Sequence, residues 1–501
     1  MSSLTRRSLL KGVAGSTLAL GAMGTATAAD GREQYVVTAP GDGALKRLER
    51  RGAEVVASIA DDTVHLVLAG EETDLNGVGG VTSVDPNGGY RLLGPAKQAT
   101  STAESLDDQY ASLQWDKMAE TTGAFEAHDT ATGDGSTVAI IDTGIDEQHP
   151  DIPAVMEKGR LFRADGLTSP DGEPTVAGDE TIEANLHPDS EEVEPYVWRG
   201  PPETRTQSAA DDVQSHGSHC AGIATAKNDV DADGVPEDVG VAGMAPDADV
   251  VPLRVFYWKK LEEYELDADG DGEVEETIPV VTTLFTTDFD ILSAIDYAPD
   301  AGADAANMSL GGGVIKGAEH STGEHVAYQR VTQDAVKRGT VVTASAGNAS
   351  ANLQQGGFYT LPNSVPGALS VSATGPNNEL VFYSNYGTSD IDVGAPGGGY
   401  ETLEKTLAAD TEWPFPTNLV LSTVPPDLND GLAYDWYAGT SMAAPQVAGL
   451  VALVREVAPD MSAKKVQNVI ERTARHSNGK SSPELGAGVI YAPDALEEAQ
   501  R

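Results

Sequence analysis

Short apolar segments that alternate with helical patterns run through most of this chain, and they constrain its fold more than any other feature. Apolar segments of strand length without a polar face belong to a parallel sheet that helices cover on both faces. The apolar segments span residues 137–141, 250–255, 303–309, 340–346 and 368–373, and the helical patterns span 216–226, 289–298, 325–338 and 441–457. We therefore predict an α/β fold with a parallel sheet, whose functional groups gather at the carboxyl ends of the strands.

A small α+β module precedes this region. Residues 34–38, 53–56 and 64–68 read as strands and residues 43–51 as a helix. The small polar residues that follow lack periodicity, which is typical of a linker. The sequence predicts four parts: an export signal at 1–28, a small α+β domain at 29–93, a linker and processing region at 94–106, and the main domain at 107–501.

Two acidic stretches, 160–210 and 258–287, interrupt the pattern of the main domain. We interpret both as surface insertions. The sequence does not decide whether they are lids, binding loops or surface segments without a function of their own.

The first 28 residues carry the features of an export signal. Residues 5–11, with Arg6 and Arg7, resemble a twin-arginine motif. The apolar stretch at 12–24 is too short and too rich in Gly and Ala to span a bilayer stably. An A-x-A cleavage site ends at Ala28. The sequence therefore predicts secretion by the twin-arginine pathway, folding before export, and no membrane association afterwards.

The composition is strongly acidic, with 78 Asp and Glu against 32 Lys and Arg and a formal net charge of -46. Such a charge repels phosphate, so it excludes nucleic acid and anionic membranes as partners. Self-repulsion strains a compact fold in low salt, and molar salt screens it. We therefore predict adaptation to high salt, against the alternative of an acidic exported protein from a mesophile. Cys220 is the single cysteine, so no internal disulfide is possible.

Four polar residues stand at strand ends or helix starts. Asp142 ends the first apolar segment, in D-T-G, and His216 opens a helical pattern, in H-G-S-H, that Ser215 is expected to cap. Ser441 opens an apolar helix, in G-T-S-M-A-A-P, where unpaired N–H groups suit an oxyanion. Asn348 follows a buried strand, in S-A-G-N, and its amide suits a second oxyanion donor.

Each motif has a plainer interpretation when it is taken alone. D-T-G also occurs in aspartic proteases, although no second copy stands at a comparable strand end here. Ser441 alone is a helix N-cap, and Asn348 alone is a turn residue after Gly. His216 and His219 form H-x-x-H, as metal pairs do, but the small residues around them favour a helix packed tightly on the sheet.

Together, and in this order, the four motifs resemble those of the subtilases, and the resemblance covers nearly all of the chain after about residue 107. The chain order Asp, His, Ser is the order of subtilisin. An α/β-hydrolase carries G-x-S-x-G and another order, and a chymotrypsin-like enzyme is all-β. The export signal and the acidic surface make the chain similar to the secreted halolysin-type proteases of haloarchaea.

The resemblance implies a serine endopeptidase that hydrolyses polypeptides through an acyl-enzyme, as a monomer without an organic cofactor. Ser441 would attack, His216 would take its proton, Asp142 would orient the imidazole, and Asn348 and the Ser441 N–H would hold the oxyanion. The module at 29–93 would be the intramolecular chaperone and inhibitor of a zymogen. An ordinary small α+β domain is the alternative for that module.

The resemblance also implies where substrate binds. An exposed strand would pair with the substrate backbone by strand addition. Its residues are Ser309, Leu310, Gly311 and Gly312. The opposite wall of the first specificity pocket would be formed by Ala344, Ser345, Ala346 and Gly347.

The chain departs from the family at three positions that carry no catalytic role. Ser218, Gln446 and Cys220 stand where Thr, His and Val are usual. We expect Cys220 to be an inert core residue, because it lies in a helix-packing context.

Two clusters of alternating Asp residues have the spacing of calcium loops. Asp229, Asp231 and Asp233 follow the helix of His216, where the family places a calcium loop, and Asp151 matches another ligand of that site. We therefore predict one structural Ca2+ site from these four residues, against a solvated acidic loop. The second cluster, at 267–271, has no such support, and neither loop has the Glu at position twelve that an EF-hand requires.

Two other classes of protein compete with the enzyme hypothesis. One is a catalytically silent binding protein that keeps the fold, and the other is a calcium-binding surface protein with a vestigial protease domain. The presence of Asp142, His216 and Ser441 argues against both.

Overall fold

The computed structural model describes most of the chain. The described residues are 18–28, 31–70, 72–92, 110–164, 175–176, 179–183, 192–194, 196–201, 204–227, 240–266, 274, 276–312, 315–316, 324–354, 358–408, 418–429, 431–476 and 482–501. The twin-arginine segment lies outside them.

An eight-stranded sheet forms the centre of the main domain, in the order β25-β24-β22-β19-β7-β14-β8-β9. All neighbouring strands are parallel except β8 and β9. The strands are β7 (Thr137–Asp142), β8 (Arg160–Phe162), β9 (Thr175–Val176), β14 (Asp249–Arg254), β19 (Ala305–Met308), β22 (Val341–Ser345), β24 (Leu369–Thr374) and β25 (Val393–Pro396). The predicted α/β fold with a parallel sheet is thereby confirmed.

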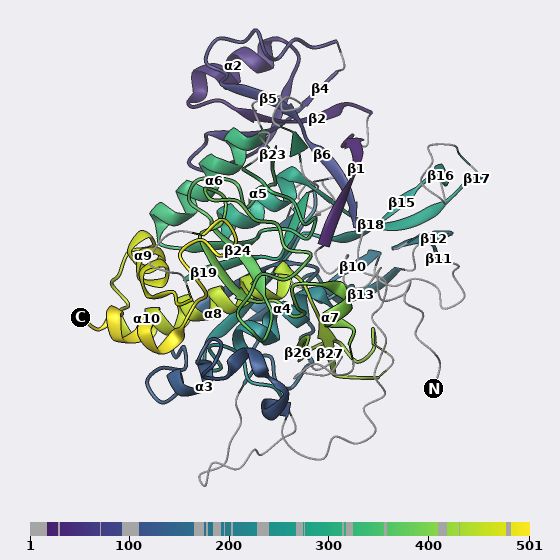
Figure 1. Cartoon of the computed structure of the whole chain (residues 1–501). Coiled ribbons are helices and arrows are strands. Elements are labelled where there is room, and N and C mark those ends of the chain that lie inside the picture. Colours follow the sequence, from purple (N-terminus) through teal and green to yellow (C-terminus); the bar gives the residue numbers. More distant parts are fainter. Residues whose placement is uncertain are drawn as a thin grey trace.

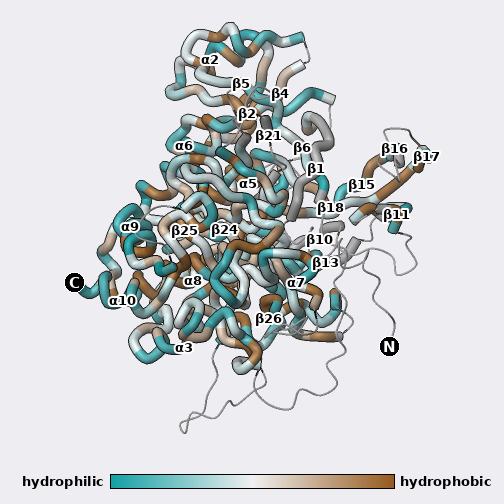
Figure 2. The backbone as a smooth tube through the Cα atoms, in the orientation of Figure 1, coloured by the Kyte–Doolittle hydropathy of each residue, from teal (hydrophilic) through white to brown (hydrophobic). Residues whose placement is uncertain are grey.

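Helices cover both faces of this sheet, and β7 shows why its sequence is apolar throughout. Val138 and Ile140 belong to one core cluster, with α4 (His216–Thr225) and α8 (Thr440–Val457). Ala139 and Ile141 belong to the other, with α5 (Asp288–Tyr297) and α6 (Glu324–Arg338). Alternate residues of the strand thus face opposite helical layers. Figures 1 and 2 show how the helices are arranged around the sheet. All five predicted strands and four predicted helices are present, with ends within two residues of the expected ones.

The first core extends outward to the C-terminus. α9 (Ala463–Thr473) and α10 (Ala492–Ala499) contribute Val466, Ile470 and Leu496 to it. The short helix α3 (Ala124–Ala127) lies near α10. No helix in the described ranges is both long and apolar enough to cross a membrane.

The N-terminal module has its own sheet, in the order β3-β4-β2-β5, and its own small core. Its elements are β2 (Glu33–Thr38), α2 (Asp42–Arg50), β3 (Glu54–Ile59), β4 (Val64–Ala69) and β5 (Ser83–Pro86). The module sits on α5 and α6 (Figure 1), and Val36, Val64 and Leu66 join the core beneath those helices. The predicted β-α-β-β order is present, and β5 is an additional strand.

A third sheet joins segments that are distant in the sequence, in the order β11-β12-β18-β6-β1-β20, with β15 beside β18. Its strands are β1 (Leu18–Thr25), β6 (Gly88–Leu92), β11 (Glu192–Glu194), β12 (Val197–Arg199), β15 (Tyr257–Leu261), β18 (Val281–Thr287) and β20 (Leu310–Gly312). The described parts of both acidic insertions are therefore largely strands. Two more antiparallel pairs lie in them: β10 (Asp179–Glu183) with β13 (Thr204–Ser208), and β16 (Tyr264–Leu266) with β17 (Glu276–Ile278).

Candidate active site

Asp142 and His216 form a buried pair at the carboxyl edge of the main sheet. Asp142 is the last residue of β7, and His216 is the first residue of α4. His216 Nδ1 lies 2.9 and 3.0 Å from the two carboxylate oxygens of Asp142, and the Thr143 N–H also donates to that carboxylate, at 2.8 Å. Burial lowers the pKa of His216, but the Asp142 carboxylate and the Cys220 side chain together oppose burial and raise this pKa well above its ordinary value.

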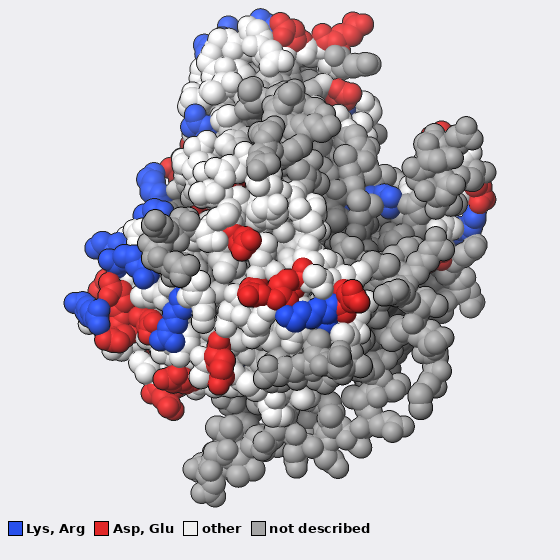
Figure 3. All heavy atoms as spheres, in the orientation of Figure 1, with Lys and Arg blue, Asp and Glu red and all other residues white. Residues whose placement is uncertain are grey.

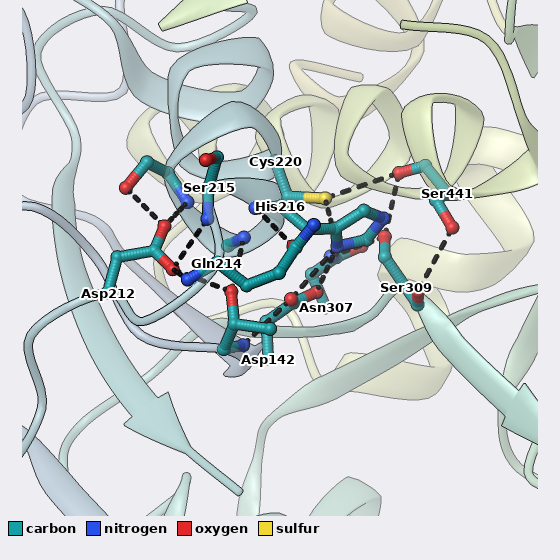
Figure 4. Close-up of polar contacts among 12 residues, drawn as sticks. Asp142, Asp212, Gln214, Ser215, His216, Cys220, Asn307, Ser309 and Ser441 are labelled. Atoms are coloured by element: carbon teal, nitrogen blue, oxygen red, sulfur yellow. Dashed lines mark hydrogen bonds and ion pairs between the residues drawn. The ribbon is translucent and has the colours of Figure 1, made fainter. Parts of the chain in front are cut away.

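Ser441 lies on the other side of the His216 ring, at the start of α8 (Figure 4). Its Oγ donates to the backbone oxygen of Ser309 at 3.0 Å, and its own backbone oxygen accepts from Ser309 Oγ at 2.7 Å. His216 Nε2 is buried and has no hydrogen-bond partner among the described residues. The three residues are thus assembled, with the Ser441 hydroxyl directed to Ser309 rather than to His216.

Asn348 is tied to the start of the Ser441 helix. Its side-chain oxygen accepts hydrogen bonds from the Thr440 N–H at 3.0 Å and from the Thr440 hydroxyl at 2.8 Å. Thr440 Oγ1 in turn accepts from the N–H of Gly347 at 3.1 Å. These bonds fix the rotation of the amide, so that its oxygen faces Thr440 and its nitrogen faces away.

Two details at His216 differ from the sequence analysis. Ser215 makes no capping hydrogen bond and has a φ of 102°, so the predicted Ser cap is wrong. The carboxylate of Asp212 instead accepts hydrogen bonds from the N–H groups of Ser215 and Ser218 at the start of α4. The sequence analysis did not identify this residue. The sequence gives little indication of this role, because an Asp four residues before a helix cannot be distinguished from the many other acidic residues of this chain.

Cys220 and His219 lie one turn along α4, and both are buried. The Cys220 Sγ lies 3.5 Å from the Ser441 backbone oxygen and 3.7 Å from His216 Nδ1, and burial raises the pKa of the thiol. The His219 ring stacks on Tyr437 with centroids 4.2 Å apart, and burial lowers its pKa to about 3. His219 is therefore a neutral packing residue on this helix.

The predicted substrate strand is β20, and it has a neighbour in this structure. Leu310, Gly311 and Gly312 pair in parallel with residues 18–20 of β1. On its far side β1 pairs with β6, and β6 pairs with β18. The facing segment, Ala344 to Gly347, leaves the end of β22, where Gly347 has a φ of 94°.

Of the predicted calcium ligands, only Asp151 is described. Its Oδ2 accepts from the hydroxyl of Tyr434 at 2.8 Å and from the N–H of Val241 at 3.2 Å. Its backbone oxygen accepts from the N–H of Lys227 at 2.8 Å. Asp229, Asp231 and Asp233 lie outside the described residues, as does the second Asp cluster.

An acidic cavity of about 630 Å3 lies beside the strand end that carries Asp142. Asp146, Glu147, Asp211, Asp212 and Asp427 are among its lining residues. Burial, together with the charges of Asp212 and Asp146, raises the pKa of Asp211 to about 7.

This architecture, with a buried Asp–His pair and a helix-borne Ser at the carboxyl edge of a parallel sheet, is the subtilisin-like fold. The chain belongs to the subtilase family, because the model of the Subtilase family matches residues 133–488.

Individual relatives agree with this membership. The extracellular protease of Xanthomonas campestris pv. campestris is 32% identical over 374 residues, which cover 74% of this chain and 53% of that protein. Thermitase of Thermoactinomyces vulgaris is 28% identical over 357 residues, which cover 71% of this chain and 86% of that protein. The structure of fervidolysin from Fervidobacterium pennivorans shares the fold, with a TM-score of 0.56 at 21% identity, over 96% of this chain and 64% of that one. The chain spans only about half the length of the first relative.

Proposed function

We propose that this chain is a secreted serine endopeptidase that cleaves polypeptides through an acyl-enzyme. The observation that carries the proposal is the buried Asp142–His216 pair beside Ser441, at one edge of a subtilisin-like sheet. A carboxylate on Nδ1 fixes the tautomer in which Nε2 accepts a proton. His216 Nε2, without another partner among the described residues, is the base that this chemistry requires.

The reaction begins when Ser441 Oγ leaves the Ser309 backbone oxygen and turns to His216 Nε2. His216 takes the hydroxyl proton as Oγ attacks the scissile carbonyl, and the Asp142 carboxylate stabilises the imidazolium. The Ser441 N–H, at the start of α8, and the amide nitrogen of Asn348 hold the oxyanion. His216 then protonates the leaving amine, and water releases the acyl group by the same proton path.

The enzyme is made as a zymogen, in which the N-terminal module is the inhibitor. Three contacts at the module support this. The Phe289 N–H at the start of α5 donates to Asn87 Oδ1 at 2.9 Å, the Ala60 N–H donates to Asp296 Oδ1 at 3.1 Å, and the Tyr90 hydroxyl donates to Asp288 Oδ2 at 3.0 Å.

A structural Ca2+ ion is bound by Asp151 together with Asp229, Asp231 and Asp233. Asp151 is 5% exposed and accepts hydrogen bonds from Lys227 and Val241, which lie in the sequence on either side of the segment 228–239 that carries the other three carboxylates. Bound Ca2+ would neutralise the four carboxylates and fix this loop. The buried position of the Asp151 carboxylate supports the proposal.

Secretion by the twin-arginine pathway and activity in molar salt complete the proposal. A net charge of -46 and an N-terminal twin-arginine-like segment support them.

The test is hydrolysis of casein by the mature enzyme in molar NaCl with Ca2+. The Ser441→Ala variant should lose activity completely, whereas Ser462→Ala, at the exposed start of α9, should keep it. A phosphonylating serine reagent should label the wild type and the Ser462→Ala variant only. Equal activity of wild type and Ser441→Ala, or none in either after removal of residues 1–106, would reject the proposed function.

A further inference from the structure

One buried carboxylate, that of Asp212, gathers an unusual number of hydrogen bonds close to the catalytic pair. Asp212 is 3% exposed. Its Oδ1 accepts from the Thr143 hydroxyl at 2.8 Å, the Gln214 N–H at 2.9 Å and the Ser215 N–H at 3.0 Å. Its Oδ2 accepts from the N–H and the hydroxyl of Ser218, at 2.9 and 2.6 Å. Five donors therefore converge on one side chain.

These donors come from the two segments that carry the catalytic pair. Thr143 follows Asp142 directly, and Ser218 lies two residues after His216. Two further bonds close the connection: the Gly217 N–H donates to Thr143 Oγ1 at 2.9 Å, and the Asp146 N–H donates to Ser218 Oγ at 2.9 Å. Figure 4 shows Asp212 on the side of His216 that is away from Ser441.

The two segments approach so closely that their relative position depends on these bonds. A Cβ placed on Gly217 would lie 2.0 Å from the backbone oxygen of Gly144, and Gly144 has a φ of 108°. No side chain fits between the segments there, so they meet backbone to backbone. The hydrogen bonds to Asp212 and Thr143 hold them in this position.

We propose that Asp212 is a positioning residue that holds the Asp142 strand end and the first turn of α4 in the register required for the Asp142–His216 bond. The proposal rests on the proposed function, since it concerns the efficiency of that site. The charge state matters, because a carboxylate offers acceptors on both oxygens. An amide in its place would present a donor to the donors of Ser218, or to those of Thr143, Gln214 and Ser215. A change of this kind misplaces the imidazole by fractions of an ångström, which lowers the rate of the proton transfer.

A plain helix-capping role would have a different signature, and α5 offers the matched control. Asp290 is also fully buried at a helix start, where it accepts from the Thr287 N–H at 2.9 Å, the Thr287 hydroxyl at 2.8 Å and the Ala164 N–H at 2.7 Å. The helix that it caps carries no catalytic residue. Asp290→Asn therefore reports the cost of weakening a buried cap alone.

The experiment compares Asp212→Asn, Thr143→Val and Asp290→Asn in the mature enzyme, in molar NaCl. It measures kcat and KM on a peptide amide, the unfolding midpoint, and the fraction of molecules that a phosphonylating reagent labels at Ser441. The value of kcat is calculated per labelled molecule, so misfolded protein does not lower it. We expect Asp212→Asn and Thr143→Val each to lower kcat about 10- to 100-fold with KM within about twofold, and the double variant to be little worse than either, because both act through one connection.

Asp290→Asn should lower the unfolding midpoint and leave kcat unchanged. A wild-type kcat in Asp212→Asn, with only a lowered midpoint, would overturn the proposal. If Asp212→Asn does not fold, Thr143→Val decides: a normal kcat in that variant overturns the proposal equally. An inactive wild type would count against the proposed function instead, so the two failures are distinguishable.

Discussion

At the scale of single residues, the site depends on what each buried polar group is paired with. Asn348 shows the point most directly. Thr440 holds its oxygen, so only the nitrogen side of the amide can serve an oxyanion. The residue that precedes the nucleophile thereby sets the orientation of the second oxyanion donor.

Replacing Asn348 by Leu should remove that donor and keep the volume of the side chain. We expect kcat to fall about 100- to 1,000-fold with little change in KM, which is the known loss for a single oxyanion donor in subtilisin itself. Steady-state kinetics on a peptide amide measure both. Asn352→Leu, in the same segment after β22, is the control and should retain activity. A rise in KM without a loss of kcat would show that Asn348 binds the substrate in its ground state instead.

The partly buried carboxyl of Asp211 should make a contribution to stability that falls as the pH rises. Its pKa is about 7 in the folded protein, against about 4 in an unfolded chain. Between these values the folded state keeps a proton on Asp211 that the unfolded state releases, so the contribution of this group to stability declines from about pH 4 to about pH 7 and is then constant.

Asp211→Asn should remove this penalty, so the variant should gain stability relative to the parent at pH 8 and lose the advantage towards pH 4. A gain on the order of 1 kcal/mol or more is expected at pH 8, since each unit of pKa shift corresponds to about 1.4 kcal/mol. Urea unfolding in the Ser441→Ala background, which cannot digest itself, measures it. Asp460→Asn, on an exposed surface, is the charge-matched control. An equal effect at both pH values would contradict the assignment.

At the scale of elements, α8 is joined to the start of the main domain by a buried polar triad. Lys117 Nζ lies 2.7 Å from both Asp116 Oδ2 and Gln446 Oε1, and Gln446 Nε2 donates to the same Asp116 oxygen at 2.7 Å. Lys117 is fully buried, and burial lowers its pKa. The departure of Gln446 from the His that is usual in the family therefore accompanies a buried ion pair.

Lys117→Met should leave the Asp116 carboxylate buried without its cation, which costs about 3–5 kcal/mol in the free energy of unfolding. Denaturant unfolding of the Ser441→Ala protein measures this. Lys337→Met, at an exposed ion pair with Asp61, is the control and should change stability by less than about 0.5 kcal/mol. A small effect of Lys117→Met would show that water or a relaxed backbone solvates Asp116.

The local sequence pattern predicted the strands and helices of the main sheet well, because burial on both faces makes strands such as β7 apolar throughout. It also predicted Asp142, His216 and Ser441 from their places at element ends, and the structure brings the three together. Pairings between distant segments could not be predicted. No periodicity in residues 88–92 indicates that they pair with 285–287, nor that Leu310 pairs with Leu18. The role of Asp212 could not be predicted for the same reason, since it depends on the Thr143 hydroxyl, at a strand end about seventy residues away.

At the scale of the whole molecule, charge is the feature that local structure leaves unexplained. On the face shown in Figure 3, the described acidic side chains are spread over the surface and do not form one patch. Many ion pairs lie on the surface, such as Arg475 with Asp494, but 78 acidic groups against 32 basic ones leave most carboxylates without a cation to pair with. Their mutual repulsion opposes the compact state throughout the molecule.

The fold should therefore gain stability steeply as NaCl rises from about 0.1 to 1 M and more slowly above that, because the screening length falls from about 10 Å to about 3 Å over this range. The unfolding midpoint of the Ser441→Ala protein, in constant Ca2+, measures the effect without autolysis. Sucrose of equal osmolality strengthens apolar burial without screening charge, so it separates the two causes. If sucrose stabilises as much as NaCl does, or if the midpoint in 0.1 M NaCl already equals that in 2 M, repulsion between the carboxylates does not limit this fold, and the acidic surface needs an explanation other than salt.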